Sequence, residues 1–142
     1  MTEQETMQIE WVCEKLVRQF VNYSDKYEYA KMCALFTHDA IFVRPSAPDQ
    51  EIKGRDVILE AFKKRPQMII MHMISNHVVE VLSATEATGY SYISFQGATN
   101  VDDPLPLTAG QTLFGEFVDR YVRTEAGWRI AERRGKLLLK GA

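Results

Sequence analysis

The hydrophobic period of the chain changes near Pro66, and this change limits the possible fold more than any other feature of the sequence. Before Pro66, apolar residues recur at helical spacing, as in Ile9, Val12 and Leu16. From Met68 onward the composition shifts to Val, Ile, Phe, Tyr and Thr with partial alternation, which is typical of strands. Helices that come first and strands that follow them indicate an α+β fold.

The part of the chain before Pro66 predicts helices at 2–25, 27–36 and 54–64. Thr2 followed by Glu5 forms a capping-box pattern at the start of the first helix, and Pro66 stops the third. A strand at 40–44 follows the second helix. The segment 45–53 contains two prolines and several polar residues, so we expect an exposed loop there.

The rest of the chain predicts four strands, at 68–82, 87–95, 113–123 and 127–139. The connections at 83–86 and 124–127 are short enough for antiparallel hairpins. The connection at 96–112 is long and contains glycine, proline and aspartate. Loops of that length in small domains are commonly functional lids or partly disordered tips.

Length and composition indicate a single globular domain over residues 1–142, because 46% of the residues are hydrophobic and 25% are charged. The formal net charge is -2 and no block of Lys and Arg occurs, which argues against a nucleic-acid partner. No apolar run approaches the ~20 residues that span a bilayer, so we expect a cytoplasmic protein without a membrane partner. Cys13 and Cys33 are predicted to be reduced packing residues.

Asp25 ends the first predicted helix, where the helix dipole disfavours an unpaired negative charge. An acid at this position needs a cationic or hydrogen-bonding partner, unless it is a solvated turn residue. His72 is a candidate partner, because it lies within the otherwise apolar strand at 68–82. A carboxylate that orients an imidazole is a minimal general-base device, whereas a histidine on an apolar strand can also be purely structural.

Strict alternation along the strand at 68–82 places His72 and Asn76 on one face and His77 on the other. Both faces are largely apolar, so we expect both to be covered: one by helices or a cavity, the other by a partner subunit. A homodimer through the convex sheet face is therefore predicted. No further His or carboxylate lies at a ligand-like spacing around His72, and neither a metal nor a cofactor is expected.

The whole chain resembles the SnoaL-like branch of the nuclear-transport-factor-2-like superfamily. The resemblance rests on the helix that ends in Asp25 and on the order and spacing of four further segments, 35–40, 52–56, 72–76 and 127–130. It implies a strongly curved antiparallel sheet wrapped around N-terminal helices that pack in its concave face, with a pocket inside this cone. The superfamily contains dehydratases, isomerases, polyketide cyclases, a dehydrochlorinase and noncatalytic proteins, so the fold alone does not define the chemistry.

The resemblance also implies roles for individual residues. Asp25 and His72 fall where dehydratase-like and dehydrochlorinase-like members carry an Asp/His dyad, and Arg133 falls near a leaving-group arginine. Strand alternation leaves open whether Arg133 or Arg134 faces the pocket. Several dehydratase members have a tyrosine or lysine at the position of Phe20, so another hydroxyl would have to replace it. The predicted site comprises Asp25 and His72 as catalytic residues and Phe20, Tyr23, Asn76, Tyr90, Tyr92 and Arg133 as substrate-binding residues.

These observations predict cofactor-independent acid-base chemistry, either elimination by a dehydratase-like lyase or isomerisation. Side chains of Met, Phe, Ile and Tyr around the pocket favour a small, mainly apolar or aromatic substrate. The alternative is a noncatalytic module of the same fold that binds a small molecule or a protein, with Asp25 and His72 as a structural pair.

Overall fold

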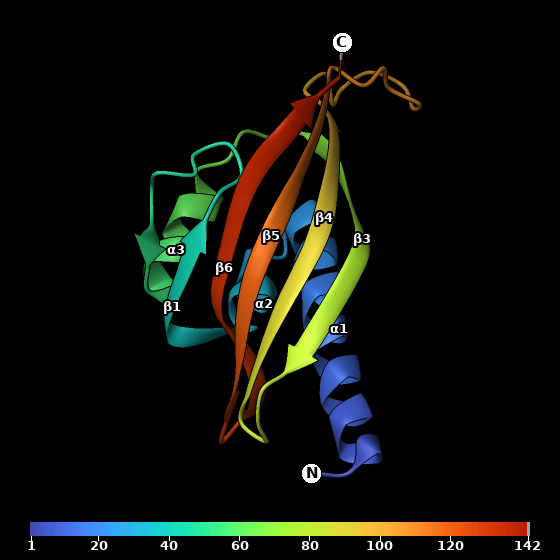
Figure 1. The fold of residues 1–142 in the computed structure, drawn as a ribbon. Coiled ribbons are helices and arrows are strands. Elements are labelled where there is room, and N and C mark those ends of the chain that lie inside the picture. The colour runs from blue at the N-terminus through green and yellow to red at the C-terminus, as the bar shows by residue number, and fades with distance from the viewer. Residues whose placement is uncertain (142) are drawn as a thin grey trace.

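A layer of helices covers one face of a six-stranded sheet in the computed structural model, which describes residues 1–141 (Figure 1). The helices are α1 (Glu3–Asp25), α2 (Tyr29–Cys33) and α3 (Arg55–Lys63). The strands are β1 (Phe36–Val43), β2 (Ile52–Lys53), β3 (Ile69–Val81), β4 (Glu86–Ala98), β5 (Gln111–Thr124) and β6 (Gly127–Lys140). The predicted α+β class is therefore confirmed.

The sheet has the strand order β2-β1-β6-β5-β4-β3, and its two edge strands do not pair with each other. Strands β3 to β6 form an antiparallel meander, as the short connections predict. The expectation of a wholly antiparallel sheet is wrong in one place, because β1 runs parallel to β6. All the other strands lie between β1 and β6 in the sequence, but in the sheet the two strands are neighbours and run in the same direction.

Helix α1 begins as its capping box predicts. The Thr2 hydroxyl accepts a hydrogen bond from the backbone N–H of Glu5 at 3.1 Å, and the Glu5 carboxylate accepts one from the Thr2 backbone N–H at 2.9 Å. The helix then packs along β3 and against α2. Its last residue, Asp25, is thereby brought next to His72 on the edge strand β3. Within residues 1–141, none of the helices combines the length and the apolar character that crossing a bilayer requires.

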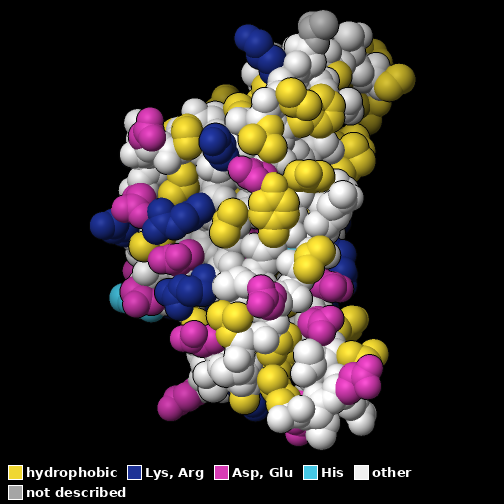
Figure 2. All heavy atoms as spheres, in the orientation of Figure 1, with side chains coloured by type: hydrophobic (Ala, Val, Ile, Leu, Met, Phe, Trp, Pro, Cys, Tyr) yellow, Lys and Arg dark blue, Asp and Glu magenta, His cyan; other side chains and the backbone are white. Residues whose placement is uncertain are grey.

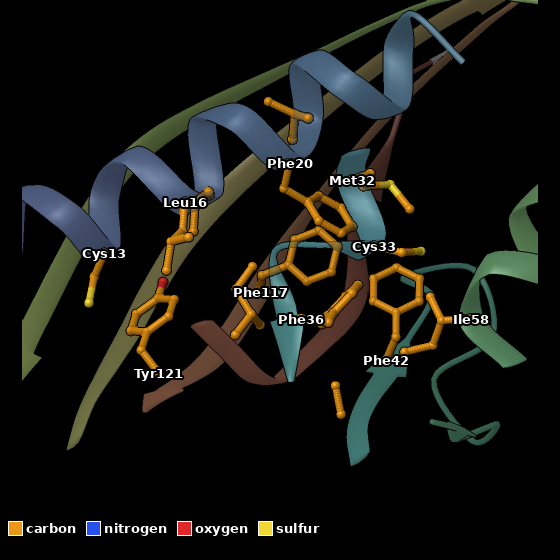
Figure 3. Close-up of a cluster of buried hydrophobic side chains, with 14 of the residues drawn as sticks. Cys13, Leu16, Phe20, Met32, Cys33, Phe36, Phe42, Ile58, Phe117 and Tyr121 are labelled. Carbon is orange, nitrogen blue, oxygen red and sulfur yellow. The ribbon is translucent and has the colours of Figure 1, made fainter. Parts of the chain in front are cut away.

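Aromatic side chains form the centre of the core between the helices and the sheet (Figure 3). Phe20 of α1 lies edge-on to Phe36 of β1 at 5.6 Å and to Phe62 of α3 at 6.3 Å between ring centroids. Phe42 of β1 lies between Phe62 at 5.3 Å and Phe117 of β5 at 6.3 Å. These contacts fix α1, α3 and the strands β1 and β5 against one another beside the cavity described below.

Candidate active site

Asp25 makes two hydrogen bonds to His72. Its Oδ2 atom accepts the backbone N–H of His72 at 2.8 Å, and its Oδ1 atom is hydrogen-bonded to the Nδ1 atom of the imidazole. The carboxylate at the end of α1 therefore holds both the strand and the ring. Of the two ring nitrogens, Nε2 has no hydrogen-bond partner within the described chain.

The imidazole of His72 packs edge-on against the ring of Phe95 on β4, with centroids 5.2 Å apart. The side chains of His72 and Asp25 are 20% and 16% exposed, so both are shielded from bulk water without being sealed. A ring held at Nδ1 by a carboxylate and on one side by an aromatic ring has little rotational freedom. This arrangement presents Nε2 in a fixed direction.

His72 lines a cavity of about 260 Å³. The cavity lies between α1, α3 and the inner face of the sheet, and most of its lining is aromatic or aliphatic. The apolar lining residues are Phe20, Val21, Phe42, Pro45, Phe62, Ile93, Phe95, Leu113, Phe117 and Leu137. A hollow of this size and composition suits a small, mainly apolar molecule with few polar groups.

Two arginines are the cationic side chains of this lining, and our sequence analysis did not identify them. Arg44 follows β1 and donates from Nη2 to the Ala61 carbonyl at 3.0 Å, and Arg65 follows α3 and donates from Nη1 to the Ser24 hydroxyl at 2.9 Å. Burial lowers the pKa of Arg44, and the neighbouring positive charge of Arg65 lowers it further. Strand alternation contains a signal for Arg44, because it shares a face with the buried Phe42.

The predicted substrate-binding aromatic residues divide between the two faces of the sheet. Phe20 lines the cavity, whereas Tyr23 lies in a separate groove beside Trp11 and Trp128. Tyr90 and Tyr92 are 38% and 44% exposed and point away from the cavity, contrary to the expectation. Residues at odd positions of β4 face inward, which places Ile93 and Phe95 in the cavity and the two tyrosines outside it.

A β-bulge in β3 changes the expected positions of Asn76 and His77. Ser75 pairs with Tyr92 and Val78 pairs with Tyr90, so two residues of β3 lie opposite one residue of β4. Asn76 adopts φ 52° at this bulge and is exposed, so it does not share the compartment of His72 as expected. His77 instead turns inward, where its Nε2 atom lies 3.1 Å from the Tyr121 hydroxyl.

A second bulge, in β6, decides which of the two arginines faces inward. Glu132 pairs with Arg120 and Ile130 pairs with Tyr121, so Ala131 is the extra residue. The register then changes, and Arg133 is fully buried. Arg134 points outward and pairs with Glu51 at 2.7 Å.

Arg133 does not line the cavity, contrary to its predicted role in substrate binding. Its Nη1 atom lies 2.7 Å from Oδ2 of Asp119, and its guanidinium carbon lies 3.7 Å from the ring centroid of Phe117 and 4.8 Å from that of Phe20. Phe20 and Phe117 both line the cavity. The arginine therefore supports two rings of the cavity wall through cation–π contacts instead of reaching a ligand.

The described part of the chain, residues 1–141, brings no three His, Cys, Asp or Glu side chains together as metal ligands would require. The polar groups of the cavity are instead an imidazole, two guanidinium groups, Ser24, Ser46 and Gln111. The imidazole can accept or transfer a proton, and the guanidinium groups can bind an anion.

Comparison with solved structures supports the same fold. The chain superposes on LinA with a TM-score of 0.83 and 16% identity over 99% of this chain and 92% of that one. A scytalone dehydratase-like protein from Novosphingobium aromaticivorans gives 0.79 and 20% over 99% and 91%. A protein of unknown function with a cystatin-like fold from Nostoc punctiforme gives 0.69 and 19% over 97% and 94%. At these identities the likeness establishes the fold alone.

A comparison with curated proteins found no match. The family model of the SnoaL-like domain, in contrast, matches residues 5–134, which include every element from α1 to most of β6. The chain therefore belongs to the SnoaL-like family.

Proposed function

We propose that this protein is a cofactor-independent acid-base enzyme that acts on a small, mainly apolar or aromatic molecule by elimination or isomerisation. The observation that carries the proposal is the placement of His72. Its Nδ1 atom is hydrogen-bonded to Asp25, its Nε2 atom has no partner within residues 1–141, and its side chain lines an apolar cavity. A base needs this combination of a fixed ring, a free nitrogen and a space for substrate.

In the proposed reaction, Nε2 of neutral His72 takes a proton from a carbon atom of the substrate. The electron pair of that C–H bond forms a double bond, and in elimination the leaving group departs with its own bonding pair. In isomerisation the imidazolium returns the proton to a different carbon. Asp25 fixes the tautomer with hydrogen on Nδ1 and stabilises the imidazolium. A positioned base of this kind contributes about 100- to 10,000-fold in rate.

The structural neighbours support elimination as the first reaction to test. They include a scytalone dehydratase-like protein and two hexachlorocyclohexane dehydrochlorinases. Loss of water and loss of hydrogen chloride are both eliminations that begin with the removal of a proton from carbon. Family membership is consistent with a small-molecule lyase or isomerase.

The test starts with a thermal-stabilisation screen of hydroxylated, halogenated and unsaturated ring compounds, followed by turnover assays on the compounds that bind. His72→Gln should lose turnover and retain the melting temperature within a few degrees. His38→Gln is the matched control, because His38 is exposed and lies outside the cavity. Equal turnover of the wild type and His72→Gln would refute the proposed role of the imidazole.

A noncatalytic binding module is the second candidate, and one observation favours it. Asp25 also accepts the backbone N–H of His72, so the carboxylate contributes to the attachment of β3 to α1 whether or not chemistry occurs. If the screen yields tight ligands that neither the wild type nor any variant converts, the cavity is a binding site and the Asp25–His72 pair is structural.

A further inference from the structure

Arg44 and Arg65 lie in the same cavity as His72 and are held by the same aromatic ring. Their guanidinium carbons lie 5.6 Å and 5.5 Å from the ring centroid of Phe62, and both side chains are partly buried. Arg65 also lies 5.9 Å from the ring centroid of Tyr29. Stacking of this kind fixes the planes of the two groups and leaves their N–H donors directed along the edges.

The part of the chain that the structure describes supplies no acidic partner for the two arginines. Among residues 1–141, neither Arg44 nor Arg65 lies within salt-bridge distance of a carboxylate. Asp25 is the acid at the end of the neighbouring helix, and its two oxygens already bind His72. Each arginine makes one side-chain hydrogen bond, to the carbonyl of Ala61 or the hydroxyl of Ser24, and both acceptors are neutral.

This arrangement has an electrostatic cost within the protein alone. Two like charges share a largely apolar cavity. Their mutual repulsion is stronger than in water, because both groups are partly buried. The pKa of Arg44 is lowered by burial first and by Arg65 second, which shows the direction of both effects. Buried or partly buried charges in proteins are normally paired, and the described residues supply no such counter-charge for these two groups.

We propose that Arg44 and Arg65 bind a carboxylate group of the ligand, and that the substrate class is a small apolar or aromatic carboxylic acid. This inference rests on the proposed function in that the ligand occupies the cavity that His72 lines. Guanidinium groups bind carboxylates through paired, charge-assisted N–H···O bonds, which supply both affinity and orientation. A ligand held at one end by the arginines and packed against the aromatic lining would present its carbon atoms to His72.

The proposal can be tested with a matched pair of neutral and anionic probes, trans-cinnamamide and trans-cinnamate, by isothermal titration at equal ionic strength. The wild type should bind the carboxylate about tenfold or more tightly than the amide. Added NaCl should weaken the binding of cinnamate and leave that of cinnamamide unchanged. Equal affinity for the two probes in the wild type would overturn the proposal.

Arg44→Gln and Arg65→Gln should each reduce cinnamate affinity by about tenfold while cinnamamide affinity stays within about twofold. Arg65→Lys keeps the charge and should therefore lose less cinnamate affinity than Arg65→Gln. It should still bind more weakly than the wild type, because an ammonium group cannot form the paired bonds. Arg123→Gln is the matched control, because Arg123 is an exposed arginine on β5 outside the cavity. A preference for cinnamate that survives the Arg44→Gln/Arg65→Gln double substitution would also refute the proposal.

His72→Gln separates this inference from the proposed function. The variant should keep the preference for cinnamate over cinnamamide, even though turnover of any substrate is expected to be lost. If no compound is converted by the wild type but the preference depends on the arginines, the acid-binding site stands and the catalytic proposal fails. If the preference disappears in His72→Gln and persists in both arginine variants, the imidazole binds the anion and the inference is wrong.

Discussion

Asp119 and Arg133 form an ion pair in which both side chains are completely excluded from solvent. Oδ2 of Asp119 also accepts a hydrogen bond from the Tyr121 hydroxyl at 2.9 Å, and the guanidinium lies against Phe117. Oδ1 of Asp119 and two nitrogens of Arg133 have no hydrogen-bond partner. The pair therefore depends on its one ion-pair contact, the Tyr121 hydrogen bond and the cation–π contacts for compensation of a large desolvation cost.

Removal of either partner alone should destabilise the fold strongly. We expect Asp119→Leu or Arg133→Met to lower the free energy of unfolding by about 3–5 kcal/mol, because each leaves an uncompensated buried charge. The double variant should be more stable than either single variant, since it leaves no charge unpaired. Urea denaturation of the four proteins measures this double-mutant cycle. A double variant no more stable than the worse single variant would contradict the prediction.

Asp25→Asn should reduce turnover by about 100- to 10,000-fold with a modest loss of stability. An amide nitrogen can donate to Nδ1 of His72, which moves the hydrogen to Nε2 and removes the basic lone pair from the nitrogen that lacks a protein partner. The asparagine oxygen can still accept the backbone N–H, so the strand stays attached. Circular dichroism and turnover on one preparation separate the two effects. Full turnover in a folded variant would show that the carboxylate does not orient the base.

The stability of the protein should fall as the pH decreases below the usual pKa of histidine because of His77. Burial lowers the pKa of this residue from 6.5, and Asp119 opposes the shift. The charged groups that act on His77 are Asp119 on β5, Arg133 on β6 and Glu14 and Arg18 on α1. Because the folded state resists protonation, the unfolded state binds more protons in this range, and stability is lost as the pH falls through the lowered pKa.

The measurement is the free energy of unfolding at about pH 7.5 and about pH 5 for the wild type and His77→Gln. A glutamine can still donate to the Tyr121 hydroxyl, which itself donates to Asp119. The pH dependence of the variant should be shallower than that of the wild type. An identical slope in both proteins would show that His77 is not the group responsible.

The outer face of the sheet carries large exposed apolar side chains over β3 to β6, and we predict that a second copy of the chain covers it. Figure 2 shows hydrophobic side chains gathered over these strands, with charged side chains beside them. The outer face is defined by Met71, Met73, Val78, Tyr90, Tyr92, Phe114, Val118 and Leu139, each at least 38% exposed. Glu116 lies within this face between Phe114 and Val118, opposite Lys136 of β6, so the face carries both charges and can be self-complementary in a two-fold contact between two copies.

Sedimentation of the wild type at micromolar concentration should show a dimer, and Met73→Lys/Val118→Lys should shift it to a monomer. A stable contact buries on the order of 800 Å² per partner, so two charges near its centre are enough to prevent it. Val57→Lys is the control, because Val57 is 56% exposed on α3, away from the outer face. A monomeric wild type, or an oligomer that the double substitution leaves intact, would refute the prediction.

The two cysteines should be unreactive in the folded protein. Burial raises the pKa of Cys13 to about 12 and that of Cys33 to about 11, so almost no thiolate is present at neutral pH. Both side chains are also at most 2% exposed. A thiol reagent such as Ellman's should label neither residue under native conditions and both in urea. Rapid labelling of the native protein would show that the core opens readily near these residues.

The arrangement of elements was predictable because it depends on local patterns. The strand expected at 68–82 is β3, Ile69–Val81, and the one expected at 127–139 is β6, Gly127–Lys140. The second helix is shorter than expected and β1 begins at Phe36 instead of 40. Phe36 pairs with Ile130 of β6, and this contact between distant parts of the chain has no local signal in the sequence.

Residues on either side of a bulge could not be assigned to a face from alternation. One extra residue reverses the direction of every side chain that follows it, and this explains the positions of His77 and Arg133. Asn76 is the one local hint, since asparagine tolerates the left-handed φ of 52°. Arg65 was missed for another reason: it lies outside the regular elements, where periodicity gives no direction.

The two hydrogen bonds of Asp25 place different constraints on which residues positions 25 and 72 can tolerate. Its bond to the backbone of β3 is available to any residue at position 72, because every residue except proline supplies that N–H. Saturation mutagenesis should therefore find position 25 intolerant for reasons of folding and chemistry together. Tolerance at position 72 reports on chemistry far more directly. A library scored for both abundance and activity would therefore distinguish the role of the imidazole in turnover from that of the backbone hydrogen bond in folding.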